Sequence, residues 1–312
     1  MMRKLRYTLT LLVCFGFITQ AQETTVYYHN NNEITKNTDS ATYYMKFSKL
    51  DNGSFAFQSY CMDNILKEKG TVQNISTLIK DGEITTFYTN GNMMDKTNFI
   101  AGLPGGIQIH YFADGTVNYK TMVNSAGYGF TNQAESDTKY LFCATPDHQV
   151  ILEDGNGYFK AYNNQLEVTQ EGTVINTFAD GTWKGYENNQ LAFIEVYKNG
   201  VLIKGENFSL DGNIYQYAQR NRRPEPKGGI NSFYNYIASS LQSASGIDAK
   251  VMMKFIVDPS GNLKNIEVIN SSNKKINSLA ISALKNAPKW NPALEQGKPI
   301  QFAYYMPINI KN

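Results

Sequence analysis

The sequence has few of the side chains on which enzyme and metal sites are built. Among its 312 residues there are three histidines, three cysteines and two tryptophans. His29, His110 and His148 have no second histidine, cysteine or carboxylate at a metal-ligand spacing. The Ser-x-x-Lys matches at Ser136 and Ser271 lack the further motifs of serine–lysine enzymes. We therefore expect a non-enzymatic protein with no cofactor and no metal.

Proline and long hydrophobic runs are also scarce. Nine prolines in the whole chain exclude a long, stiff Pro-rich spacer. The main apolar run, residues 9–18, has about half of the ~20 residues that a membrane-spanning helix needs. Because Arg3, Lys4 and Arg6 precede it and Thr19-Gln20-Ala21 follow it, residues 1–21 are predicted to be a signal peptide. We expect an exported protein, periplasmic or associated with the outer membrane, with no membrane span in the mature chain.

Two cysteines, Cys61 and Cys143, remain after residue 21. An export compartment permits a disulfide between them. Two buried free thiols that pack as small apolar groups are the other interpretation, and the sequence leaves both open.

The net charge of +2 conceals an asymmetry along the chain. Residues 22–216 contain 13 Lys and Arg against 22 Asp and Glu, a balance of −9. Residues 217–312 contain 13 against 5, a balance of +8. A basic C-terminal part favours an acidic partner, although its scattered lysines also fit an ordinary solvated surface. Export and the lack of an aromatic–basic motif argue against nucleic acid.

The last third of the chain has the pattern of a small α+β domain. After Gly228-Gly229, apolar residues recur every three or four positions and predict an amphipathic helix: Ile230, Phe233, Tyr234, Ile237, Ala238 and Leu241. Strict alternation over residues 251–257 precedes turn residues at 258–262 and a second strand-like run to residue 269. This stretch predicts a β-hairpin.

A second helix and a final strand complete the predicted domain. The helical period over residues 276–284 ends before Pro288, because proline breaks a helix. The last strand is predicted at residues 300–308. The order is helix, strand, strand, helix, strand, with one sheet face covered by both helices. Trp290, in Pro-Lys-Trp-Asn-Pro, is expected to pack against the sheet or the second helix.

These motifs resemble a known family. The Pro-x-Gly-Gly helix start, the Val-Asp-Pro-Ser-Gly-Asn hairpin, Pro-Lys-Trp-Asn-Pro, Gly297-Lys298-Pro299 and the closing Tyr-Met-Pro-Ile strand resemble the TonB C-terminal domain as found in Bacteroidetes. The resemblance implies a periplasmic domain that binds the TonB box, an extended peptide of outer-membrane transporters, by strand addition. Residues 242–248 depart from the pattern, since they lack the Tyr-Pro pair that often ends the first helix.

The preceding part of the chain repeats with a period of 24 residues. Gly82, Phe87-Tyr88 and Asn90-Gly91 match Gly106, Tyr111-Phe112 and Asp114-Gly115, and residues 157–166 return near 181–191. Asn-Gly and Asp-Gly between aromatic pairs are strong hairpin signals. Each unit is then a hairpin that must stack on its neighbours. The units resemble degenerate MORN-like repeats.

The domain organisation follows from these patterns. We expect a mainly β repeat meander at residues 22–217, a polar linker rich in Pro and Gly at 218–229, and the α+β domain at 230–312.

The candidate site is the edge of the last strand: Gln301, Phe302, Ala303, Tyr304 and Tyr305. Side chains alternate along a strand, so one of the two tyrosines should be buried and the other exposed. The leading hypothesis is an interaction protein that binds a TonB-box-like peptide of a transporter by β-augmentation. An accessory energy transducer and a purely structural envelope protein stay open as alternatives.

Overall fold

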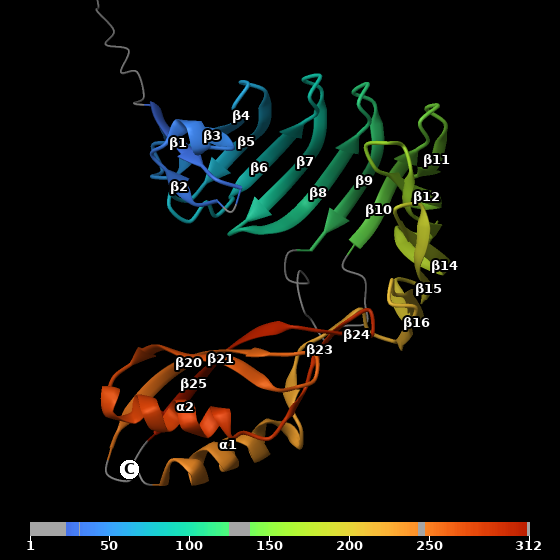
Figure 1. The fold of residues 1–312 in the computed structure, drawn as a ribbon. Helices are drawn as coiled ribbons and strands as arrows, with labels where there is room; N and C mark the ends of the chain where they lie inside the picture. Colours follow the sequence, from blue (N-terminus) through green and yellow to red (C-terminus); the bar gives the residue numbers. More distant parts are fainter. Residues whose placement is uncertain (1–22, 31, 125–137, 243–246, 311–312) are drawn as a thin grey trace, which may run out of the picture.

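The computed structural model describes residues 23–30, 32–124, 138–242 and 247–310. The predicted signal peptide therefore lies outside the described residues. Strands account for 58% of the chain and helices for 10%, which confirms the predicted fold class of a β meander followed by an α+β domain. Figure 1 shows the meander in blue to yellow and the C-terminal domain in orange to red.

The N-terminal domain is one 17-stranded antiparallel sheet. Each strand from β3 to β17 pairs with the next one along the chain, and β1 lies between β2 and β3. A short 3-10 helix at Thr38–Ser40 precedes β3. The strands are β1 Glu23–Tyr28, β2 Ile34–Thr35, β3 Tyr43–Lys49, β4 Phe55–Cys61, β5 Leu66–Val72, β6 Gly82–Phe87, β7 Met93–Ile100, β8 Leu103–Tyr111, β9 Val117–Val123, β10 Thr138–Ala144, β11 Val150–Glu153, β12 Asn156–Tyr162, β13 Val168–Ile175, β14 Phe178–Glu187, β15 Gln190–Lys198, β16 Val201–Phe208 and β17 Ile214–Tyr217.

A recurring five-residue turn explains the sequence period. The Tyr88 N–H donates to the Asn92 carbonyl at 2.9 Å, and 24 residues later the Phe112 N–H donates to the Thr116 carbonyl at 2.8 Å. The fourth residue of each turn has a positive φ, 87° at Gly91 and 90° at Gly115. Glycine adopts this conformation without steric cost, which explains why Asn-Gly and Asp-Gly recur at this position of the turn.

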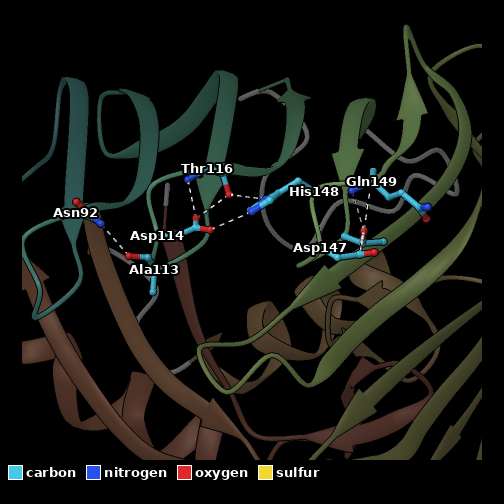
Figure 2. A network of polar contacts seen from close by, with 8 residues as sticks. Asn92, Ala113, Asp114, Thr116, Asp147, His148 and Gln149 are labelled. Atoms are coloured by element: carbon cyan, nitrogen blue, oxygen red, sulfur yellow. Dashed lines mark hydrogen bonds and ion pairs between the residues drawn. The ribbon is translucent and has the colours of Figure 1, made fainter.

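Side chains link one turn to the next (Figure 2). The Asn92 side-chain amide donates to the Ala113 carbonyl at 2.9 Å. Asp114 accepts hydrogen bonds from both the backbone and the hydroxyl of Thr116, which hold its pKa below the usual value. His148, in the next turn of this kind, lies 3.5 Å from the Asp114 carboxylate. These contacts join neighbouring repeats at one end of the strands.

Among the described residues, the sheet has two hydrophobic clusters. The first lies around Phe47 and Phe57, and the second around Trp183, which is completely buried. The Trp183 indole N–H donates to the Thr173 carbonyl at 3.0 Å. A Cβ on Gly172 would lie 2.3 Å from the Trp183 ring, so this glycine gives the ring its space. The aromatic residues of the repeats thus form much of the domain interior.

The two cysteines among the described residues, Cys61 and Cys143, are free thiols. Cys61 is half-buried in β4. Cys143 is buried in β10, where desolvation raises the pKa of its thiol to about 11. The structure therefore contains two free thiols and no disulfide between them.

The C-terminal domain has the predicted order of main elements: α1 Gly229–Ser240, β20 Ala249–Val257, β21 Leu263–Ser271, α2 Asn277–Lys285 and β25 Phe302–Ile310. A 3-10 turn at Lys274–Ile276 leads into α2. The last strand begins two residues later than the predicted 300–308. The three strands form an antiparallel sheet in the order β21-β20-β25, with both helices on one side (Figure 1).

Trp290 lies at the centre of the domain core. Its ring centroid lies 5.1 Å from that of Phe233 in α1, 5.4 Å from that of Phe255 in β20 and 5.0 Å from that of Tyr304 in β25. The indole is 1% exposed. Trp290 therefore packs against the sheet, as expected, and its helix contact is with α1.

The segment predicted as a linker pairs with the C-terminal domain. It contains β18 Asn221–Arg222, which pairs with β23 Ala293–Glu295, and β19 Glu225–Pro226, which pairs with β22 Trp290–Asn291. The strand β24 Lys298–Ile300 completes a hairpin with β23. Two-residue strands carry no periodicity, which is why the sequence shows only the polar, Pro-rich character of this segment.

The hairpin β23–β24 also contacts the end of the meander. The Gln296 N–H donates to the Arg220 carbonyl at 2.5 Å, and the Asn207 amide donates to the Gln296 side-chain oxygen at 3.2 Å. Lys298 donates to the Ser209 hydroxyl at 2.8 Å. These bonds tie the C-terminal domain to β16, to the turn that follows it and to the segment after β17.

Candidate functional site: the outer edge of β25

The strand β25 lies at an edge of the C-terminal sheet. It pairs with β20 along its whole length, from Phe302 opposite Val257 to Ile310 opposite Ala249. Within the described residues no strand pairs with its other side. An edge strand leaves half of its backbone N–H and C=O groups without a ladder partner, so it can accept an additional strand.

Two observations identify which backbone groups of β25 point outward. The Lys250 carbonyl accepts a hydrogen bond from the Ser272 N–H at 3.0 Å, so the backbone of Lys250 faces the β21 side of β20. Because the direction alternates along a strand, Val251 and every second residue after it face β25. Their partners in β25 are its even-numbered residues, from Phe302 to Ile310.

Pro307 agrees with this assignment. It lies opposite Met252, and proline has no N–H with which to bond β20. Within sheets, proline occurs on edge strands with its nitrogen turned away from the ladder. The outward N–H donors of β25 are therefore those of Ala303, Tyr305 and Asn309, and Pro307 contributes only a carbonyl.

The five residues expected from the sequence divide into three groups. Gln301 precedes β25 and is exposed. Phe302 and Tyr304 are half-buried, face the helices and turn their backbone groups toward β20. Ala303 and Tyr305 are exposed and carry the outward backbone groups; Tyr305 is 58% exposed. The two tyrosines differ as strand alternation requires: Tyr304 packs on Trp290, whereas Tyr305 is exposed.

The opposite edge, β21, is less suited to pairing. Its register against β20 shifts twice, between Met252 and Met253 and between Lys254 and Ile256. Bulges of this kind bend a strand and interrupt regular pairing. The register of β25 against β20 is regular throughout.

The hairpin turn beside the site is held by a carboxylate. Asp258 accepts hydrogen bonds from Lys264 Nζ at 2.9 Å and from the backbone N–H groups of Ser260 and Asn262, both at 2.9 Å. The lysine bond is the main reason why the pKa of Asp258 lies well below its usual value. Trp290 also bonds to this turn: its backbone N–H donates to the Gly261 carbonyl at 2.8 Å.

The sequence pattern did not indicate that two apolar residues of α1 are exposed. Ile230 and Tyr234 lie four residues apart on α1, and each is 41% exposed. Their spacing assigns them to the apolar side of the helix, but periodicity does not say which residues of that side are covered. The face opposite the helices also has exposed apolar side chains, Met252 at 37% and Tyr305.

Residues 241–311 match the family model described as Gram-negative bacterial TonB protein C-terminal. This part of the chain is TonB-like. The match confirms the resemblance to the TonB C-terminal domain, and it spans β20, β21, α2 and β25. A search among curated proteins finds no match to the chain.

The TonB-like domain bounds the function of the chain in coarse terms. Its family consists of non-enzymatic protein-interaction domains of envelope-associated proteins in Gram-negative bacteria. Among the described residues, no helix is long and apolar enough to cross a membrane. In the same residues, no group of three or more His, Cys, Asp or Glu side chains could hold a metal ion. The TonB C-terminal domain implies involvement in TonB-related interactions of the envelope.

Proposed function

We propose that the protein is a non-enzymatic, exported interaction protein whose C-terminal domain binds an extended peptide by adding it to β25. The observation that carries this proposal is the regular edge strand with outward donors at Ala303 and Tyr305. In β-augmentation, such backbone groups supply affinity and side chains supply specificity.

The partner we propose is the TonB-box peptide of a TonB-dependent outer-membrane transporter. The match of residues 241–311 to the TonB family supports a protein partner of this kind. The balance of +8 in residues 217–312 favours a peptide with acidic residues. The meander, which we interpret as a MORN-like repeat domain, acts as a scaffold bound to the peptide-binding domain by the β23–β24 hairpin.

A capture experiment tests the proposal. The mature chain, residues 22–312, is immobilised and exposed to an outer-membrane extract in three forms: wild type, Ala303→Pro and Ala303→Ser. Proline removes one outward N–H and leaves the ladder to β20 intact, whereas serine keeps that N–H. We expect wild type and Ala303→Ser to retain a TonB-dependent transporter and Ala303→Pro to lose it.

Circular dichroism establishes that each variant is folded. Equal capture by the two folded variants would contradict β-augmentation at this edge and favour the reading as a structural envelope protein. Capture of an inner-membrane protein together with the transporter would favour the energy-transducing alternative.

A further inference from the structure

The first helix has two exposed apolar side chains, Ile230 and Tyr234, which together we call the apolar flank. On α1, Phe233 and Ile237 are buried and face the sheet. Tyr236 lies to one side of them, and its hydroxyl donates to the Ala283 carbonyl of α2 at 3.0 Å. At about 100° per residue, Ile230 and Tyr234 lie on the other side of Phe233 and Ile237. They therefore point away from α2.

The position of α1 relative to the sheet turns this flank toward the outer edge of β25. The helix α2 packs against β21, at the far side of the sheet. The helix α1 lies next to α2 and contacts Trp290 through Phe233, and Trp290 in turn contacts Tyr304 of β25. This places α1 below the β25 half of the sheet, with Ile230 and Tyr234 on its outer side.

The apolar flank and the outward donors lie at the same end of the domain. Phe233, which lies between Ile230 and Tyr234 in the sequence, packs on Trp290, and Trp290 packs on Tyr304. Tyr304 stands between Ala303 and Tyr305, the two adjacent outward donors. Beyond them Pro307 has no N–H to offer. A bound strand would thus be centred on residues 303–305.

An added strand would lie about 4.8 Å outside β25, with alternate side chains on opposite faces. Its helix-facing side chains would then extend over the exposed sides of Ile230 and Tyr234. We propose that this flank selects the peptide: the segment bound at β25 has apolar side chains at the alternate positions that face α1. This inference rests on the proposed binding of a peptide at β25 and adds the chemical class of that peptide.

Exposure supports this assignment. Ile230 and Tyr234 are each 41% exposed although they belong to the apolar side of an amphipathic helix. Exposed apolar side chains next to an open strand edge are a feature of peptide-binding sites. A peptide with acidic ends and an apolar alternating centre would match both this flank and the basic charge of residues 217–312.

Two synthetic peptides test the inference by fluorescence anisotropy with the mature chain. The first alternates threonine and valine over seven residues, the second has threonine at all seven positions, and both end in aspartates. Both can pair with β25 through their backbones, and only the first offers apolar side chains to α1. We expect the alternating peptide to bind wild type about tenfold more tightly, because its valine side chains are only partly buried against the flank.

The paired substitutions Ile230→Gln and Tyr234→Gln remove the apolar flank at exposed helix positions. In this double variant, we expect the two peptides to bind with equal affinity and the all-threonine peptide to bind as it does to wild type. Ile269→Gln is the matched control, because Ile269 is 52% exposed on β21, away from the β25 edge. It should leave the preference for the alternating peptide unchanged.

The outcomes separate this inference from the proposed function. If wild type shows no preference, or if the double variant keeps it, the selection by α1 is contradicted while peptide binding at β25 stands. If neither peptide binds wild type, or if folded Ala303→Pro binds both as wild type does, the proposed function fails and the inference with it.

Discussion

Glu195 and Arg220 form an ion pair in which the carboxylate is completely buried. Arg220 Nε donates to Glu195 at 2.7 Å, and Nη2 makes a second bond to the same carboxylate. The hydroxyls of Tyr197 and Tyr217 also donate to it, at 2.9 and 2.7 Å. Because the Arg220 carbonyl receives the Gln296 N–H, this pair lies where the meander meets the β23–β24 hairpin.

Arg220→Met should therefore destabilise the chain. It leaves a buried carboxylate without its cation, which typically costs 3 to 5 kcal/mol. We expect a loss of about 3 kcal/mol, because the Arg220 side chain is 42% exposed. Urea unfolding of wild type and variant measures this change in the free energy of unfolding. The double variant Glu195→Gln/Arg220→Met should be more stable than Arg220→Met alone; a lower stability would contradict the buried-charge explanation.

Trp290→Ala should destabilise the C-terminal domain strongly. The side chain contacts three aromatic rings, and truncation of a buried tryptophan costs about 3 to 5 kcal/mol. Trp290→Phe should cost less, because the indole N–H has no hydrogen-bond partner among the described residues. Thermal melting of the two variants provides the comparison, and an unchanged melting temperature for Trp290→Ala would refute the packing role.

The turn carboxylate Asp258 should make stability depend on pH. Hydrogen bonds from Lys264, Asn262 and Ser260 lower its pKa in the folded chain, whereas an aspartate in an unfolded chain has a pKa of about 3.9. The stabilisation is therefore present above that value and is lost as the pH falls through and below it. We expect Asp258→Asn to lower the melting temperature at pH 7 and to reduce the loss between about pH 5 and pH 2. Parallel curves for variant and wild type would exclude this role.

Processing of the N-terminus is a separate prediction. The signal-peptide pattern of residues 1–21 predicts a mature chain that begins near Gln22. Intact-mass analysis of the exported protein should give the mass of residues 22–312. A mass that retains Met1, or that includes a lipid on a cysteine, would contradict the pattern.

Local rules explain what the sequence could predict. The repeat period was visible because each turn needs a residue such as Gly91 or Gly115 at positive φ. The hairpin of β20 and β21 was visible because Val251, Met253, Phe255 and Val257 alternate toward the helices. The sequence also indicates that the backbone N–H of Ala303 points outward. Pro307 lies an even number of residues away on the same strand, and it has no N–H with which to bond β20.

The missed features depend on tertiary contacts. The strands β18, β19 and β22 have two residues each, and their pairing brings together segments about 65 to 75 positions apart. The exposure of Ile230 and Tyr234 follows from where α1 lies under the sheet, not from its own periodicity. The buried Glu195 could not be recognised, because its partner Arg220 lies 25 residues away in a polar segment.

Amide hydrogen exchange of β25, followed by NMR with and without the alternating threonine–valine peptide, tests the central claim most directly. In the free protein we predict fast exchange at Ala303 and Tyr305, whose N–H groups point outward, and slow exchange at Tyr304 and Met306, which bond β20. Bound peptide should slow exchange at Ala303 and Tyr305 and leave Tyr304 and Met306 slow. Fast exchange at Ala303 and Tyr305 in the presence of saturating peptide would contradict strand addition at this edge.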